Sequence, residues 1–117
     1  MKHELFAADE LQPGDMRAVK VDGVAIVVMK TPKGDFRALR DACSHHGAAL
    51  SHGRMQPVVL GDEVGCYELS TDRFMLRCPW HGYEFDVDNG RCIADPVHAR
   101  VKAYSISVEG NRVFLER

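Results

Sequence analysis

Strand-like hydrophobic patterns dominate both ends of the chain. Residues 24–29 are apolar on both faces, which is typical of a central β-strand. Turn signals bound this run, with Asp22-Gly23 before it and Lys33-Gly34-Asp35 after it, and a short further strand is expected from Phe36 to Arg40. A single helical turn near residues 9–11 is the one weak helical signal. The first forty residues therefore predict strands joined by tight turns.

The end of the chain has the same character. From Tyr104 to Val108, hydrophobic side chains alternate with serines, which places them on one face of a predicted strand. The chain then turns at Glu109-Gly110-Asn111 and returns through residues 113–115. Between these β-rich flanks, residues 41–98 are expected to lack long strands, yet they contain all four cysteines and five of the six histidines. Candidate metal ligands are thus concentrated where the hydrophobic pattern is weakest.

Length, charge and hydropathy narrow the range of roles. A chain of 117 residues predicts one domain over 1–117, and a net charge of −2 without a basic block argues against a nucleic-acid partner. The longest apolar run, residues 24–29, is too short for a bilayer, which takes about 20 residues in a helix. The start shows no secretory signal, so we expect a cytoplasmic protein with no membrane association. In that compartment, cysteines are metal ligands or thiols more often than disulfides.

Two short motifs pair a thiol with an imidazole. They are Cys43-Ser44-His45-His46-Gly47 and Cys78-Pro79-Trp80-His81-Gly82. Two cysteines and two histidines suit either tetrahedral zinc or the two irons of a Rieske centre. The glycine behind each motif allows a sharp turn that presents backbone N–H groups at close range. Asp41, just before the first motif, is interpreted as a turn residue.

At these motifs the chain resembles the Rieske family, whose pattern is Cys-x-His, a spacer and Cys-x-x-His. The stretch from Cys78 to Asp86 is very similar to the second ligand loop of Rieske ferredoxins and oxygenases. Asp88-Asn89-Gly90 resembles the turn that follows, and Asp95-Pro96 resembles the proline loop that covers the cluster. The resemblance implies an all-β Rieske iron–sulfur domain of antiparallel sheets or a β-sandwich, with a loop-rich cluster-binding subdomain at about residues 41–98.

The same resemblance implies the cofactor, the ligands and the role. One Rieske-type [2Fe–2S] cluster would be bound per subunit, with Cys43 and Cys78 on the inner iron and His45 and His81 on the outer iron. Such a protein is an electron carrier, not a stand-alone enzyme, and has no catalytic residues. Its expected partners are a flavin-dependent reductase as the donor and a terminal oxygenase as the acceptor. A monomer is expected for a small shuttle of this kind.

The resemblance also bears on the redox potential. High-potential respiratory members carry a disulfide and two hydroxyl donors beside the cluster, at positions that correspond here to Ala48, Trp80, Tyr83 and Phe85. By this alignment, the chain lacks both the disulfide and the two hydroxyl donors. With fewer hydrogen-bond donors, the reduced cluster is less stabilised. We therefore expect a potential near the low end of the Rieske range, about −150 mV.

One departure from the family is the distance between the two motifs. Between His45 and Cys78 there are 32 residues, about twice the usual spacer. The extra length is assigned to an insertion at about residues 55–73. Residues 58–60 and 65–69 could pair across 61–64 as an elongated hairpin.

Three alternatives stay open at this stage. The chain could be the small Rieske-like subunit of a larger oxidoreductase such as assimilatory nitrite reductase, or a colourless zinc-stabilised interaction module. Cys66 and Cys92 are interpreted as small, semi-buried side chains, with a disulfide between them as the lesser alternative. The remaining histidines are assigned to the surface, one of them (His52) near the cluster mouth with a lesser role in docking: His3, His46, His52 and His98.

Overall fold

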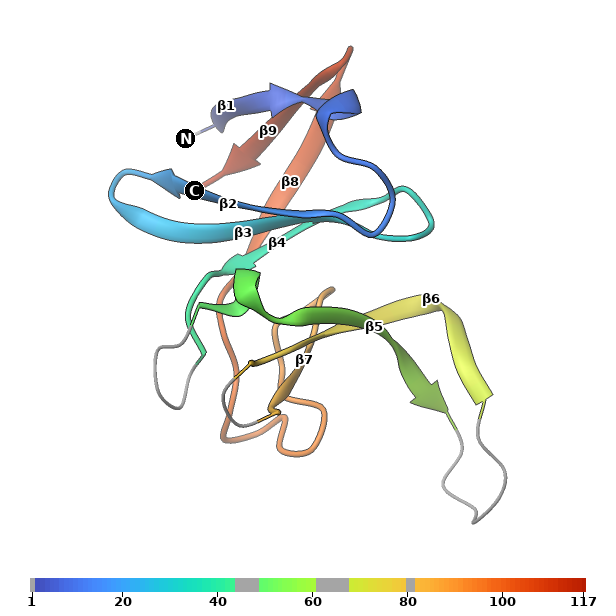
Figure 1. Ribbon diagram of the computed structural model, residues 1–117. Coiled ribbons are helices and arrows are strands. Elements are labelled where there is room, and N and C mark those ends of the chain that lie inside the picture. Colours follow the sequence, from blue (N-terminus) through green and yellow to red (C-terminus); the bar gives the residue numbers. More distant parts are fainter. Residues whose placement is uncertain (1, 44–48, 61–67, 80–81) are drawn as a thin grey trace.

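The computed structural model describes residues 2–43, 49–60, 68–79 and 82–117. Within these ranges the strands form one six-stranded and one three-stranded antiparallel sheet, the larger at the top of Figure 1. The larger sheet has the order β1-β9-β8-β4-β3-β2, with bounds β1 (Lys2–Ala7), β2 (Met16–Val21), β3 (Val24–Lys30), β4 (Phe36–Arg40), β8 (Ala103–Glu109) and β9 (Arg112–Glu116). The smaller sheet has the order β5-β6-β7, with bounds β5 (Arg54–Leu60), β6 (Glu68–Arg77) and β7 (Glu84–Asp86). The expected all-β fold is confirmed.

Local turn chemistry explains why the larger sheet was predictable. Asp22 and Gly23 both have positive φ angles, 51° and 79°, and they join β2 directly to β3. This is the backbone that a two-residue hairpin turn requires. Strand β4 has the predicted bounds, and β8 and β9 form the predicted terminal hairpin. The weak helical signal corresponds to the short 3-10 helix η1 (Ala8–Glu10).

Strand β3 is buried on both faces because a hydrophobic core lies on each side of it. Val27 and Met29 belong to one core, here called the cysteine core, and Ile26 and Val28 belong to the other, the distal core. The cysteine core consists of Val27, Met29, Leu39, Cys43, Leu50, Phe74, Leu76, Cys78, Phe85, Val87, Cys92 and Val101. The distal core consists of Phe6, Leu11, Val21, Ile26, Val28, Phe36, Ala38, Val113 and Leu115. Because successive side chains of β3 point to opposite faces, this strand contributes to both cores and so connects the larger sheet with the smaller one.

The middle of the chain contains more strand than expected. Strand β6 has ten residues, so the expectation that residues 41–98 lack long strands is wrong. Its first half reads Glu68-Leu-Ser-Thr-Asp-Arg73, and these mostly polar residues hide the hydrophobic pattern that only appears from Phe74 onward. The predicted pairing of residues 58–60 with 65–69 agrees with the structure where it is described, because Val59 pairs with Leu69 and Leu60 with Glu68. That this stretch is an insertion stays a prediction. The residues that connect the two strands, 61–67, lie outside the described ranges.

A membrane-spanning helix is not found among the described residues. The helices present there are η1 and a second 3-10 turn, η2 (Leu50–His52), each of three residues.

Candidate metal centre

The first predicted cysteine ligand follows the end of β4. The Asp41 N–H donates to the carbonyl oxygen of Ala25 at 2.9 Å, which continues the pairing of β4 with β3 for one more residue. Cys43 comes two residues later, is 2% exposed and lies in the cysteine core. Strand pairing therefore delivers this thiol to the interior at the start of the first ligand loop.

A buried carboxylate closes the base of that loop. Asp41 is 7% exposed and accepts two hydrogen bonds from Ser51, one from its backbone N–H and one from its hydroxyl, both at 2.7 Å. Ser51 belongs to η2, whose Leu50 is fully buried in the cysteine core. The sequence predicts a turn residue at Asp41 and does not predict this closing role. A short polar residue before a Cys-x-His motif is the one local signal for it.

The second predicted cysteine ligand follows the end of β6. The Cys78 N–H donates to the Tyr83 carbonyl oxygen at 2.7 Å, and the Gly82 N–H donates to the Cys78 carbonyl oxygen at 3.2 Å. Gly82 has a φ of 69°, a conformation that favours glycine, so the glycine of the second motif serves a tight turn as predicted. Cys78 is 2% exposed, like Cys43.

The two ligand loops meet through a close backbone contact. Gly53 follows η2, and a Cβ atom at this position would lie 1.9 Å from the carbonyl oxygen of Arg77. Arg77 directly precedes Cys78, and its Cα partner across the β5–β6 pair is Arg54. Only glycine permits this approach at position 53, because any side chain would displace the end of β6 that positions Cys78.

Aromatic and aliphatic side chains surround both thiols. Phe85 on β7 is fully buried in the cysteine core, and it pairs with Leu76 across the β6–β7 ladder. An isolated bridge connects Phe85 to Cys92, which is 1% exposed and has a free thiol. Cys92 is therefore fully buried rather than semi-buried, and it is not in a disulfide. Its proposed alternative partner, Cys66, lies outside the described residues.

The remaining predicted residues divide into two groups. His45, His81, His46, Trp80 and Ala48 lie outside the described residues, so the structure does not place the imidazole half of the site. Within the described ranges, no three His, Cys, Asp or Glu side chains form a metal-binding group. His52 and His98 are exposed, as expected, and the His98 Nδ1 atom lies 3.0 Å from an Asp95 carboxylate oxygen. His3 on β1 is half-buried, and its Nε2 atom lies 3.5 Å from an Asp22 carboxylate oxygen.

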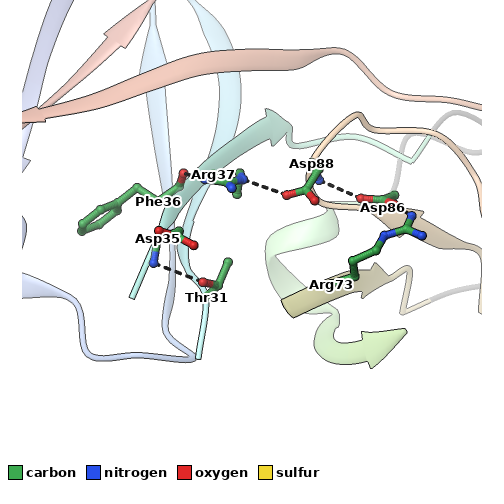
Figure 2. A network of polar contacts seen from close by, with 7 residues as sticks. All are labelled: Thr31, Asp35, Phe36, Arg37, Arg73, Asp86 and Asp88. Atoms are coloured by element: carbon green, nitrogen blue, oxygen red, sulfur yellow. Dashed lines mark hydrogen bonds and ion pairs between the residues drawn. The ribbon is translucent and has the colours of Figure 1, made fainter. Parts of the chain in front are cut away.

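A polar network attaches the smaller sheet to the larger one (Figure 2). Arg37 on β4 donates through Nε to Asp88 at 2.8 Å, and the Asp88 N–H donates to the Asp86 carboxylate at 2.9 Å. Asp86 is 2% exposed, and its other carboxylate oxygen pairs with Arg73 on β6. This network fixes the turn after β7 relative to β4 and β6. No sequence pattern indicated it, since its members are far apart in the chain.

Two cysteines buried in one apolar core, each just after the end of a β-strand, suit a β-sheet protein that binds metal through thiolates. Comparison with known families refines this class, since residues 1–105 match the Rieske [2Fe–2S] domain. The chain belongs to the Rieske [2Fe–2S] domain family.

Relatives and solved structures agree with this assignment. The chain is 29% identical over 96% of its length to the ferredoxin component of the p-cumate 2,3-dioxygenase system of Pseudomonas putida, covering 82% of that protein. It is also 29% identical over 97% of its length to the ferredoxin component of the naphthalene 1,2-dioxygenase system of Pseudomonas aeruginosa, covering 92% of it. In both cases the similarity extends over nearly the whole of this chain.

Two solved structures share the whole fold. A protein assigned as the small subunit of an NADH-dependent nitrite reductase from Mycobacterium tuberculosis superposes with a TM-score of 0.80 and 26% identity, over 100% of this chain and 95% of that one. A chain from the complex of reduced oxygenase and oxidised ferredoxin in carbazole 1,9a-dioxygenase superposes with a TM-score of 0.74 and 26% identity, over 97% and 100%.

The cofactor follows from the family. A Rieske [2Fe–2S] cluster is the prosthetic group of this domain. The two described cysteines fit such a cluster, because Cys43 and Cys78 are buried in the same core and thiolates are ligands for its iron.

Proposed function

We propose that the protein is a Rieske-type ferredoxin that carries single electrons from a flavin-dependent reductase to a terminal oxygenase. The observation that carries this proposal is the similarity to ferredoxin components over nearly the whole of this chain, which covers 82% and 92% of them. In this role the protein is a component of an oxidoreductase system and contributes no catalytic residues.

Four ligands would hold the cluster: Cys43, His45, Cys78 and His81. Support for the two cysteines comes from their burial in one core and from the contact of Gly53 with Arg77, which brings the second loop against the element that closes the first. Support for the two histidines comes from their motifs, Cys-x-His and Cys-x-x-His. When bound, the cluster supplies a centre that gains and loses one electron.

The residues around the site have three roles in this proposal. Leu50, Leu76 and Phe85 exclude water from the thiol side, which lowers the local dielectric around the bound charge. Asp41 and Gly82 hold the two loop backbones in place through their hydrogen bonds. A rigid protein environment of this kind suits electron transfer, since little has to reorganise when the charge changes.

The proposal includes an organisation of the chain. Residues 1–117 would form a single Rieske domain, with the cluster-binding subdomain at about 41–98 and the insertion at about 55–73. The β5–β7 sheet supports the subdomain, because Cys78 follows the end of β6 and the sheet adds Phe74, Leu76 and Phe85 to the cysteine core. The protein would act as a cytoplasmic monomer.

The decisive experiment is EPR spectroscopy of the dithionite-reduced protein, combined with cysteine substitutions. A rhombic signal with a low average g-value is expected for mixed Cys and His ligation, and Cys43→Ser and Cys78→Ser are each expected to abolish it. Cys92→Ala is the matched control, because Cys92 is equally buried and outside the ligand set. A colourless zinc protein, or a signal lost equally in Cys92→Ala, would contradict the proposal.

A second candidate is the small Rieske-like subunit of an assimilatory nitrite reductase. The observation that favours it is the superposition on the nitrite reductase small subunit over the full length of this chain, with a TM-score of 0.80. Affinity purification from the native host distinguishes the two. Stable co-purification of a large sirohaem protein would support the subunit, whereas reduction by a flavoprotein reductase without such a partner supports the ferredoxin.

A further inference from the structure

A groove of about 270 Å³ opens beside Cys43. Three cationic residues line it, Arg40, Arg100 and Lys102, together with Ala42, Val101 and Cys43 itself. Cys43 is 2% exposed, so its small accessible surface lies in the wall of this groove. The groove therefore connects a predicted iron ligand to the surface.

The three cations come from two neighbouring segments. The Arg40 N–H donates to the Lys102 carbonyl oxygen at 2.8 Å, which continues the β4–β8 pairing and sets these two residues side by side. Arg100 and Lys102 flank the buried Val101, so in an extended segment they share the outer face.

The three cations of the groove have no acidic partner at ion-pair distance among the described residues. None of Arg40, Arg100 and Lys102 takes part in an ion pair within these ranges, although the Lys102 ammonium lies 5.2 Å from the centre of the Tyr104 ring. Asp41 is the nearest carboxylate in sequence, but it is buried and both of its oxygens accept hydrogen bonds from Ser51. Like charges on adjacent strands repel each other, so this arrangement costs stability in the isolated protein.

We infer that this groove is the docking site for a carboxylate-rich surface of a protein redox partner. Charge complementarity supports this occupant, because carboxylates placed between Arg40, Arg100 and Lys102 would relieve their mutual repulsion. The position supports it as well, because a partner seated there would contact Ala42 and Cys43 at the start of the first ligand loop. The inference rests on the proposed electron-carrier function and adds to it the sign of the partner's surface.

The overall charge argues against nucleic acid in this groove. The chain has a net charge of −2, so the groove is a local basic site on an acidic protein, and a long polyanion would be repelled outside it. A compact acidic patch on a protein matches such a site better.

Charged electron acceptors test the inference on the intact, cluster-containing protein. The reduced protein is mixed in a stopped-flow spectrometer with plastocyanin, an acidic acceptor, or with cytochrome c, a basic one, and the second-order rate constant of cluster oxidation is measured. The variants are Arg100→Gln and the double variant Arg40→Gln/Arg100→Gln. Lys33→Gln is the matched control, since Lys33 is exposed in the turn at the other end of β4 (Figure 1).

We expect opposite responses from the two acceptors. At low ionic strength, Arg100→Gln should slow oxidation by plastocyanin about threefold and the double variant about tenfold, while oxidation by cytochrome c stays constant or accelerates. The differences should disappear in concentrated salt, which screens the charges. Lys33→Gln should change either rate constant by less than about twofold.

Three outcomes would overturn the inference. Equal effects of Arg100→Gln and Lys33→Gln would show only a dependence on net charge. A parallel change with both acceptors would show an altered driving force instead of an altered surface. A loss of rate with the small anion ferricyanide but not with plastocyanin would assign the groove to small anions only. Failure of the proposed function looks different, because the wild-type protein would then lack a reducible cluster.

Discussion

Asp41 accepts hydrogen bonds from both the backbone N–H and the hydroxyl of Ser51, at 2.7 Å each, and so joins the two ends of the first ligand loop. The carboxylate is buried, and these hydrogen bonds are therefore stronger than they would be in water. A loop closed at its base has fewer conformations to lose when it binds a metal. The Asp41–Ser51 contact is therefore a positioning device for Cys43.

Removing the Ser51 hydroxyl tests this device. Ser51→Ala deletes one of the two hydrogen bonds and leaves one oxygen of a buried carboxylate unsatisfied, which is expected to destabilise the protein by about 1–2 kcal/mol. The melting temperature should fall by about 5 °C, and the cluster should be lost faster on heating. Ser107→Ala, on the exposed face of β8, is the control and should change neither. An unchanged melting temperature for Ser51→Ala would contradict the assigned role.

Gly90 is expected to tolerate no side chain. It has a φ of 76°, and a Cβ atom there would lie 2.1 Å from the Val101 carbonyl oxygen. Gly34 has a φ of 98° and open space around it, so a substitution there measures only the free-energy cost of the unfavourable backbone conformation. We expect Gly34→Ala to destabilise by about 1 kcal/mol and Gly90→Ala by about 3 kcal/mol or more, because the second change must also displace the Val101 backbone. Chemical denaturation measures both, and similar values would show that the close approach is relaxed in solution.

Asp86 and Asp88 belong to the same network but should contribute differently. Asp86 is 2% exposed and accepts from both Arg73 and the Asp88 N–H, so Asp86→Ala is expected to cost about 2–3 kcal/mol. The Arg37–Asp88 pair is solvated, with side chains 38% and 44% exposed, so Asp88→Ala should cost less than about 1 kcal/mol. Urea unfolding of both variants decides the question. The reverse order of stabilities would contradict the view that burial determines the strength of this network.

The redox potential is expected near the low end of the Rieske range, about −150 mV. Phe85 is the described residue that bears on this value: it is fully buried in the core with both cysteines and has no hydroxyl to donate to a sulfur. Protein-film voltammetry measures the potential directly, and Phe85→Tyr should raise it by adding such a donor. Phe74→Tyr, elsewhere in the same core, is the control for a change in packing. A wild-type potential above zero would refute the expectation.

Much of the fold could be predicted because its signals are local. The turn at Asp22-Gly23 and the alternation of residues 104–108 each depend on a few neighbouring residues, and the structure has the hairpins that they predict. The pairing of residues 58–60 with 65–69 was predicted for the same reason. The extent of β6 was missed, because its first six residues are mostly polar and have no hydrophobic pattern to show a strand.

The sequence by itself determined the family and the candidate metal ligands, because each Cys/His motif is contiguous and needs no tertiary contact to be recognised. Only the tertiary structure decided how these motifs are supported: the burial of Asp41 against Ser51, the approach of Gly53 to Arg77, and the groove of cations beside Cys43. Each of these joins residues that are distant along the chain. The packing of two cores on opposite faces of β3 and β4 brings these residues together. A local sequence pattern cannot indicate such contacts, because it includes only residues that are neighbours along the chain.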